Sequence, residues 1–225
     1  MKNNKKTPAA RSQIILVDDH PIVRERLAEL INQQPDLAVC CDCDDGPACL
    51  TLLEKCRPDL AIVDLSLKTG HGLELIKDLQ IRHPKLPILV LTMHDEALYA
   101  ERALRAGARG FVTKQEPTTS IIAAIRHVLA GELYVNEQLA QKLVGALISR
   151  PKANPGPQDL LQHLTDRELE VFQLLSQGQA TRQIAETLKI DIKTVETHQA
   201  RLKEKCQVAT LEELRRYATL ACLNR

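Results

Sequence analysis

Three aspartates, a threonine and a lysine stand at or directly after short apolar runs of the sequence. They are Asp18 and Asp19, Asp64, Thr92 and Lys114. Carboxylates that lie close together repel one another unless a cation joins them, and hard oxygen ligands suit Mg²⁺, which also binds phosphate oxygens. A carboxylate beside such an ion can act as a nucleophile toward phosphorus, while a hydroxyl and an ammonium can bind phosphoryl oxygens. If these residues meet in space, their chemistry is phosphoryl transfer to a carboxylate.

The apolar runs also predict the strands that would bring these residues together. Strands are expected over residues 13–17, 36–41, 60–63, 87–92 and 109–112, with helices over residues 21–34, 46–56, 72–82, 95–107 and 118–131. This alternation predicts an α/β fold, a five-stranded, parallel, doubly wound sheet of the flavodoxin-like type. In such a sheet ligands bind beyond the carboxyl ends of the strands. In the first helix, one buried stripe is expected from Ile22, Leu27, Leu30 and Ile31.

The alternative for any one of the aspartates is structural. A single aspartate after a strand is most often a turn or cap residue. An acid pair, a third acid, a threonine and a lysine at the ends of four different strands form a more specific pattern. The whole set therefore favours a site over five unrelated turn residues.

After the last predicted strand, the sequence predicts only helices and a linker. A further helix is expected over residues 136–148, and residues 149–158 contain three prolines and a glycine, which is typical of a linker. Four helices are then expected over residues 166–177, 181–189, 192–206 and 210–222. Gly178 is expected to end the first of them and Asp191 to cap the third. The predicted domains span residues 12–133 and 160–225, joined by residues 134–159.

Composition narrows the function classes. A chain of 225 residues with 44% hydrophobic residues can form two small domains with their own cores, which excludes a disordered chain. No apolar run approaches the ~20 residues of a membrane helix. The basic start has no apolar core of a signal peptide after it, so a cytoplasmic location is expected. The C-terminal helices are not broadly basic, so binding to nucleic acid must depend on a local patch.

The seven cysteines indicate reduced, structural thiols of a cytosolic protein. Cys40, Cys41 and Cys43 crowd one predicted strand. Since neighbouring residues of a regular strand point to opposite faces, Cys40 and Cys41 are expected to point apart. No CxxC pair or nearby histidine completes a zinc set.

The N-terminal segment resembles the receiver domain of two-component response regulators. The resemblance rests on "LVDDHPIVRERL", "IVDLSL", "VLTMHDE" and "AGARGFVTK" and covers residues 12–133. It implies that Asp64 is the phosphoacceptor, that Asp19 binds Mg²⁺ directly and Asp18 mostly through water, and that Ser66 contributes its backbone carbonyl. It also implies that Thr92 and Lys114 contact the phosphoryl group, that Thr92 and Phe111 form the switch, and that His94 tunes dephosphorylation. A plain core residue and an inert loop residue are the alternatives for Phe111 and His94. Receivers often have proline directly after the lysine, where this chain has Gln115.

The C-terminal helices resemble the LuxR-type helix-turn-helix, on the stretch "LTDRELEVFQLLSQGQATRQIAETLKIDIKTVETHQARLKEKC". With the receiver this gives the NarL/FixJ arrangement. In the helix over residues 192–206, helical spacing predicts burial of Val195, Leu202 and Cys206. The exposed face provides candidates for contacts with bases, Glu196, Thr197 and Ala200, and with phosphates, Lys193, Thr194, Arg201, Lys203 and Lys205. His198 fits a structural role at least as well as a phosphate contact. Gln207 replaces a usual glycine, and a left-handed backbone there would cost roughly 1 kcal/mol.

Together the two resemblances imply a phosphorylation-controlled transcription regulator rather than an enzyme. Phosphorylation of Asp64 by a sensor histidine kinase, with Mg²⁺ as cofactor, would free the C-terminal domain to dimerise through its last helix and bind double-stranded promoter DNA. RNA polymerase is a further partner that the resemblance allows, and no membrane is involved. Two alternatives stay open. One is a DNA-binding regulator that works without phosphorylation, and the other is an aspartate-nucleophile phosphoryl-transfer enzyme, whose usual second aspartate is replaced here by Ser66.

Overall fold

A computed structural model describes residues 11–94, 96–137, 140–141, 161 and 163–223. The chain divides into two compact units, Met1–Ser149 and Arg150–Arg225, and each is described by itself. The division falls within the predicted linker. Most of the predicted helix over residues 136–148 and all of residues 149–158 lie outside the described residues, so the domain boundaries stay predictions.

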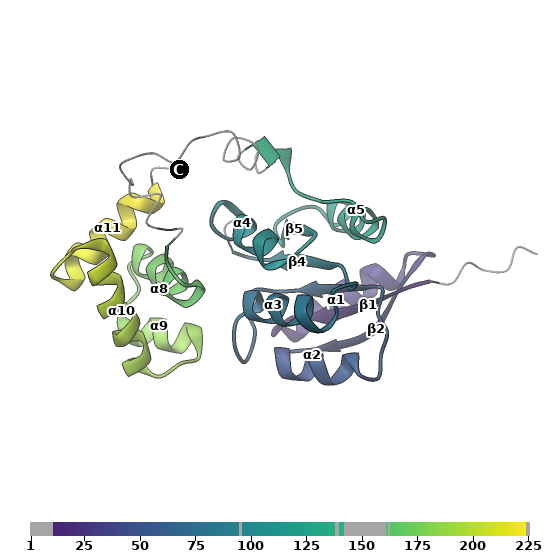
Figure 1. Ribbon diagram of the computed structural model, residues 1–225, viewed down its shortest axis with the longest axis horizontal. Coiled ribbons are helices and arrows are strands. Elements are labelled where there is room, and N and C mark those ends of the chain that lie inside the picture. Colours follow the sequence, from purple (N-terminus) through teal and green to yellow (C-terminus); the bar gives the residue numbers. More distant parts are fainter. Residues whose placement is uncertain (1–10, 95, 138–139, 142–160, 162, 224–225) are drawn as a thin grey trace, which may run out of the picture. The chain divides into compact units, whose positions relative to one another are not determined.

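The N-terminal unit is built on a parallel sheet with the strand order β2-β1-β3-β4-β5 (Figure 1). Its strands are β1 (Ser12–Val17), β2 (Leu37–Cys43), β3 (Leu60–Val63), β4 (Ile88–Thr92) and β5 (Gly110–Thr113). Its helices are α1 (Pro21–Asn32), α2 (Gly46–Leu53), α3 (Gly72–Arg82), α4 (Glu96–Ala106) and α5 (Thr118–Leu129). The order confirms the predicted doubly wound, flavodoxin-like fold. The chain adds β2 on one side of β1 and then β3, β4 and β5 on the other side, so the strand order reverses between β1 and β3.

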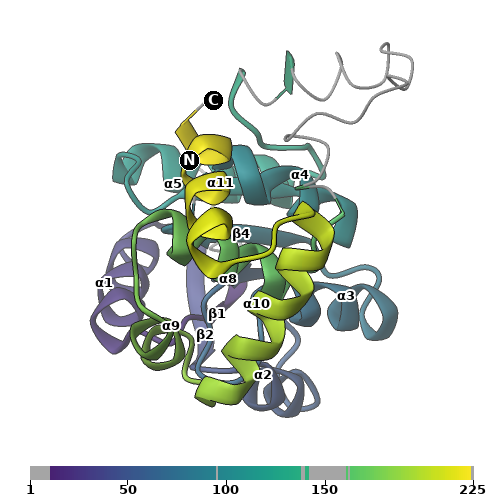
Figure 2. The same cartoon turned by 90° about the vertical axis from the view of Figure 1, so that its left-hand side faces the viewer.

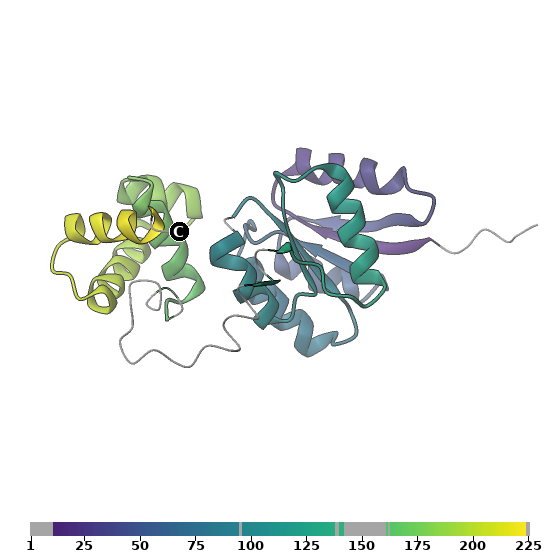
Figure 3. The same ribbon diagram turned by 90° about the horizontal axis from the view of Figure 1, so that it is seen from above.

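The largest core of this unit lies between the sheet and two helices. Side chains of α1 and α5 pack with those of all five strands, and α5 lies across β3, β4 and β5 (Figure 3). Leu27 and Ile31 of α1 are buried in this core and Leu30 is packed against it, as predicted. The prediction for Ile22 is wrong, because this residue lies in the first turn of α1, beyond the end of β1, and is 75% exposed.

An irregularity in β2 changes the expected placement of two cysteines. Ile14 pairs with Val39, but the next residue of β1, Ile15, pairs with Cys41, so Cys40 is an extra residue in the strand. Such a bulge breaks the alternation of side chains. The Sγ atoms of Cys40 and Cys41 consequently lie 3.6 Å apart, and the prediction that they point apart is wrong.

The C-terminal unit consists of α8 (Asp166–Ser176), α9 (Thr181–Leu188), α10 (Ile192–Cys206) and α11 (Leu211–Leu223) in the part of it that is described (Figure 2). Helix α10 packs on the other three helices. None of the helices in the described part of the chain has the length and apolar character needed to span a membrane.

The helix ends of this unit follow from local sequence. Thr165 and Glu168 form a capping box at the start of α8, and the Asp191 carboxylate accepts a hydrogen bond from the Lys193 amide at 2.8 Å at the start of α10. Gly178 has a φ of 79° just beyond α8. Gln207, which stands where glycine is usual, has a left-handed backbone with a φ of 55°, and Lys189 adopts the same conformation after α9.

Candidate phosphoryl site and candidate DNA-binding helix

The register of the sheet places the aspartates next to one another. Val17, the last residue of β1, pairs with Val63, the last residue of β3, and the Asp64 amide donates to the Val17 carbonyl oxygen at 2.8 Å. Asp18 and Asp64 therefore leave the sheet side by side, and Asp19 follows Asp18. One ligand atom from each of Asp18, Asp19, His20 and Asp64 lies within 4.8 Å of all the others.

The acid cluster has an unsatisfied oxygen. Asp64 is 3% exposed, and its Oδ1 atom is buried with no hydrogen-bond partner among the described residues. A buried carboxylate oxygen without a partner is costly, and a hard cation beside further carboxylates would satisfy it. Three of the four groups in the cluster are carboxylates, which offer oxygens, and one of them is Asp18, which is 5% exposed. These residues therefore fit a Mg²⁺ ion.

Lys114 supplies the positive charge of the described site. Its Nζ lies 2.7 Å from Asp64 Oδ2 and 2.5 Å from Asp18 Oδ2, and its side chain is 9% exposed. Burial disfavours the charged ammonium, but the carboxylates of Asp64 and Asp18 outweigh this effect and hold the pKa of Lys114 above its ordinary value. Lys114 is therefore a permanent cation at neutral pH, held between the two acids.

Thr92 and Phe111 come from the neighbouring strands. Thr92 is fully buried at the end of β4 and pairs with Thr113, and the Lys114 amide donates to its carbonyl oxygen at 2.8 Å. The Thr92 hydroxyl group thus lies at the end of β4, next to β5, which Lys114 directly follows. Phe111 is 1% exposed, a position that suits a switch residue and a plain core residue equally. The described residues contain no cis peptide bond, and this includes the bond before Gln115, where receivers often have proline.

Two glycines shape the loop after Asp64. Gly70 has a φ of 80°, a conformation that favours glycine. At Gly72 a Cβ atom would lie 2.2 Å from the Asp64 carbonyl oxygen and 2.6 Å from the Leu65 Cα, so only glycine fits. The start of α3 thus packs directly against the backbone of the candidate phosphoacceptor.

The sequence did not predict a role for His20 or the contacts that His94 makes. His20 Nδ1 lies 2.7 Å from Asp19 Oδ1, and its position directly after the acid pair was the available signal. His94, expected as a tuning or an inert loop residue, is hydrogen-bonded to the Ser66 hydroxyl at 2.9 Å, and its ring centre lies 4.6 Å from that of the fully buried Tyr99. The residues two beyond Asp64 and two beyond Thr92 are thus joined to each other.

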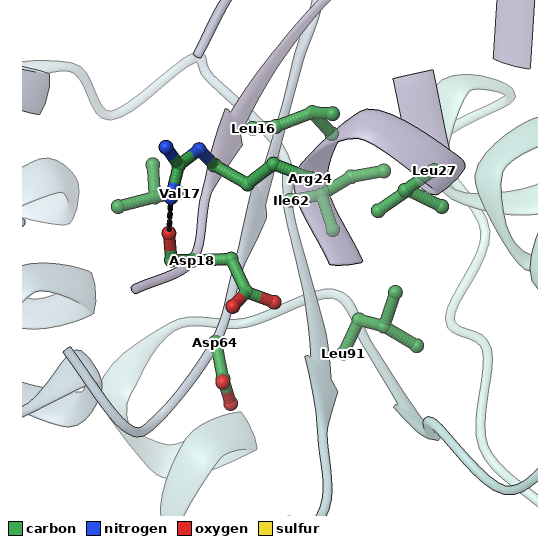
Figure 4. A pocket seen from close by; sticks show the side chains of 8 residues that line it. All are labelled: Leu16, Val17, Asp18, Arg24, Leu27, Ile62, Asp64 and Leu91. Atoms are coloured by element: carbon green, nitrogen blue, oxygen red, sulfur yellow. Dashed lines mark hydrogen bonds between the residues drawn. The ribbon is translucent and has the colours of Figure 1, made fainter. Parts of the chain in front are cut away.

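A small pocket lies beside the two buried aspartates (Figure 4). It is lined by Leu16, Val17, Asp18, Arg24, Leu27, Ile62, Asp64 and Leu91. Its carboxylates come from Asp18 and Asp64, and Figure 4 shows Arg24 hydrogen-bonded to Asp18. Arg24 is another residue that the sequence did not indicate.

Helix α10 shows the burial that its spacing predicted. Val195 and Leu202 are fully buried and Cys206 is 8% exposed. Gln199 is also buried, which was not predicted, and its side-chain amide donates to the Thr181 hydroxyl at 3.1 Å, joining α10 to α9. The opposite face is exposed over Lys193, Thr194, Glu196, Thr197, Ala200 and Arg201.

Three basic residues of α10 have surroundings that bear on their predicted roles. Lys205 Nζ lies 2.6 Å from the buried Glu168 carboxylate and donates to the His163 carbonyl oxygen at 3.1 Å, so this ammonium stabilises the unit internally. Lys203 is half-buried. Burial, and next the nearby Arg201, lower the pKa of His198, which favours a neutral structural residue over a phosphate contact.

A doubly wound unit with a buried acid site, followed by a helix-turn-helix unit, defines a DNA-binding regulator of the response-regulator class. Residues 14–126 match the family "Response regulator receiver domain", and residues 162–218 match "Bacterial regulatory proteins, luxR family". The chain belongs to the response regulators of the NarL/FixJ type, which join these two domains.

Relatives and solved structures agree with this assignment. The oxygen regulatory protein NreC of Staphylococcus epidermidis is 33% identical over 209 residues, which are 92% of this chain and 96% of that protein. A LuxR-family response regulator from Aurantimonas is 33% identical, with a TM-score of 0.57 over 62% of this chain and all of that one. RcsB from Salmonella enterica, bound to promoter DNA with a phosphomimetic, is 27% identical, with a TM-score of 0.62 over 93% of this chain and 99% of that one. A further structure, of two RcsB dimers on two DNAs, has a TM-score of 0.56 and 27% identity over 92% of this chain and 98% of that one.

Proposed function

We propose that Asp64 is the phosphoacceptor of this response regulator and that its phosphorylation controls the binding of the C-terminal unit to promoter DNA. The observation that carries the proposal is the buried Asp64 carboxylate, with one oxygen unsatisfied among neighbouring carboxylates and the other held by Lys114. The phosphoryl group would come from a phosphohistidine of a sensor histidine kinase in the cytoplasm.

In this mechanism an Asp64 oxygen attacks phosphorus, and the bond from phosphorus to the histidine nitrogen breaks. Asp18, Asp19, Asp64 and the Ser66 carbonyl would hold Mg²⁺, and a bound ion would supply positive charge for the phosphoryl oxygens. Lys114 binds a phosphoryl oxygen in place of its present partner, Asp64 Oδ2. Thr92 donates its hydroxyl to another oxygen, and Phe111 moves with Thr92 as the switch. Because this chemistry loads one group per molecule, the protein acts as a regulator and not as an enzyme with turnover.

The DNA-binding role rests on the exposed face of α10. Glu196 and Thr197 lie in its N-terminal half, where a recognition helix contacts base edges, and Ala200 follows just past its middle on the same exposed face. Phosphate contacts are assigned to Lys193, Thr194, Arg201, Lys203 and Lys205. Lys205 carries the weakest assignment, since it would have to leave Glu168.

A second copy of the chain is the proposed partner on DNA. Few basic residues face outward on α10, so a single C-terminal unit has few phosphate contacts and a dimer doubles them. Leu220 of α11 is 55% exposed, which suits an apolar dimer contact through the last helix. The RcsB dimers on DNA support this arrangement. RNA polymerase is the proposed further partner at promoters.

The test is phosphoryl uptake by the purified full chain from a small acyl-phosphate donor with Mg²⁺, measured by intact-protein mass spectrometry. The wild type and the control Asp78→Asn, an exposed aspartate of α3, should each take up one acid-labile group. Asp64→Asn should take up none, and uptake that persists in this variant would refute the assignment. Continuous release of phosphate from small phosphate esters would instead support the phosphoryl-transfer enzyme.

A further inference from the structure

An arginine at the acid site has no part in the mechanism described above. Arg24 lies at the end of the first turn of α1, four residues after His20, whose carbonyl oxygen accepts from the Arg24 amide at 3.1 Å. Its guanidinium Nη1 donates to the backbone carbonyl oxygen of Asp18 at 2.6 Å (Figure 4). Its Nε donates to Asp42 Oδ2 at 2.9 Å. One planar group thus connects the acid-bearing loop to the edge strand β2.

The carbonyl group that Arg24 binds lies between the two acidic residues of the site. It belongs to the peptide that joins Asp18 to Asp19, and a peptide is a rigid plane. A donor that fixes this carbonyl therefore fixes the plane from which both carboxylates project. The Arg24 side chain is only 17% exposed and lines the same pocket as Asp18 and Asp64, so it is held in place rather than free in solvent.

Asp42 holds the Arg24 guanidinium from the solvent-exposed side. Its side chain is 52% exposed, and a half-exposed ion pair contributes little to stability. Its effect is geometric, because it holds the Nε edge of the guanidinium and leaves Nη1 directed at the Asp18 carbonyl. A lysine could not make both contacts in this way, since an ammonium is a point donor and not a planar fork.

We propose that Arg24 is a positioning residue for Mg²⁺ binding, which acts by orienting the Asp18–Asp19 peptide, and that Asp42 holds it in that role. This inference rests on the proposed function of the acid site. Partners behind metal ligands typically change metal affinity by roughly 10-fold to 100-fold when they are removed. Removal of the Asp18–Arg24 hydrogen bond should act at the lower end of this range, because Arg24 holds a backbone atom and not the ligand oxygens themselves.

The direction in which Mg²⁺ affinity changes when Arg24 is removed distinguishes a positioning role from a purely electrostatic one. A guanidinium near the site repels Mg²⁺, so if Arg24 acted only through its charge, its removal would tighten Mg²⁺ binding. If Arg24 positions the carboxylates, its removal weakens binding although a positive charge is lost. A variant that removes the charge therefore gives opposite results under the two explanations.

The experiment is Mg²⁺ titration of the purified full chain by isothermal titration calorimetry, with circular dichroism to establish folding. Arg24→Met should raise the dissociation constant for Mg²⁺ roughly 10-fold. Arg24→Lys should lie between the wild type and Arg24→Met. The matched control is Arg26→Met, which removes an arginine of the same helix that is 79% exposed and pairs with Glu29, and it should bind Mg²⁺ as the wild type does.

Asp42→Asn tests the second half of the inference and keeps it open to refutation if Arg24→Met does not fold. It should weaken Mg²⁺ binding less than Arg24→Met, and the double variant should bind no more weakly than Arg24→Met alone. Unchanged or tighter Mg²⁺ binding in Arg24→Met would overturn the inference. If Arg24→Met does not fold, unchanged or tighter Mg²⁺ binding in both single variants, Asp42→Asn and Arg24→Lys, would overturn it.

Phosphoryl uptake by the wild type, measured in parallel, distinguishes this inference from the proposed function. Uptake at Asp64 together with unchanged Mg²⁺ affinity in Arg24→Met refutes the role of Arg24 alone. Loss of Mg²⁺ affinity in Arg24→Met together with no uptake at Asp64 refutes the proposed phosphoacceptor and leaves the role of Arg24 supported.

Discussion

Replacement of Lys114 by methionine should destabilise the N-terminal unit more than any change of an exposed lysine. The Lys114 ammonium lies between Asp18 and Asp64, and all three side chains are less than a tenth exposed. Methionine has a similar length, so the main loss is the charge. Breaking a buried ion pair by removing one partner costs about 3–5 kcal/mol, because the remaining charge is uncompensated. We expect a loss of about 3 kcal/mol in the free energy of unfolding.

Mg²⁺ should reduce this loss. The ammonium and the ion neutralise the same carboxylates, so the variant should bind Mg²⁺ more tightly than the wild type and gain more stability from it. A ligand at about 100 times its dissociation constant adds about 2.7 kcal/mol. The effect of Lys114 should be constant near neutral pH. A raised lysine pKa means that its stabilisation is complete below the ordinary value of about 10.4 and is lost only as the pH rises through the folded value.

The assay is urea unfolding of the full chain followed by far-ultraviolet circular dichroism, with and without saturating Mg²⁺. The C-terminal unit serves as an internal reference, and Lys85→Met, at an exposed position, is the matched control. A loss below about 1 kcal/mol, or a loss that Mg²⁺ does not change, would refute the reasoning that Lys114 neutralises a buried acid cluster.

Three further predictions concern the C-terminal unit. Gln207→Gly should raise the free energy of unfolding of this unit by about 1 kcal/mol in urea, because the φ of 55° favours glycine. If Gln207→Ala stabilises the unit as much as Gln207→Gly or more, this explanation is contradicted. Burial disfavours the Glu168 carboxylate, but its hydrogen bonds with Lys205 and the cap hold its pKa below the ordinary range. The resulting stability is present above pH of about 4.3 and lost as the pH falls below it, and thermal melts of Glu168→Gln should lack this dependence. Arg201→Ala should weaken binding to all DNA sequences, whereas Thr197→Ala should change the base preference in a binding selection, and an equal change of preference in both would contradict the assignment.

The sequence was sufficient for the sheet and for the main members of the acid site. Short β-branched runs specify strands locally, and parallel strands must end at one edge, so Asp18, Asp64 and Lys114 could be placed together before any coordinates. The same local logic predicted the cap at Asp191, because a helix cap depends on only a few neighbouring residues.

Features that depend on distant packing could not be predicted. The bulge at Cys40 depends on how β2 pairs with β1, and β2 carries no local mark such as glycine at that point. Lys205 meets Glu168 across two helices, and Arg24 meets the Asp18 carbonyl through the angle at which α1 begins. Ile22 was misplaced because helical spacing does not show where the sheet below a helix ends.

The central claim is that phosphorylation of Asp64 controls DNA binding. The most direct test is the affinity of the full chain for footprinted genomic fragments, measured by fluorescence anisotropy with and without an acyl-phosphate donor and Mg²⁺. The wild type should bind more tightly when the donor is present, and Asp64→Asn should bind equally with and without it. An equal rise in both proteins, or tight binding by the wild type that the donor leaves unchanged, would contradict the claim and would support a regulator that works without phosphorylation.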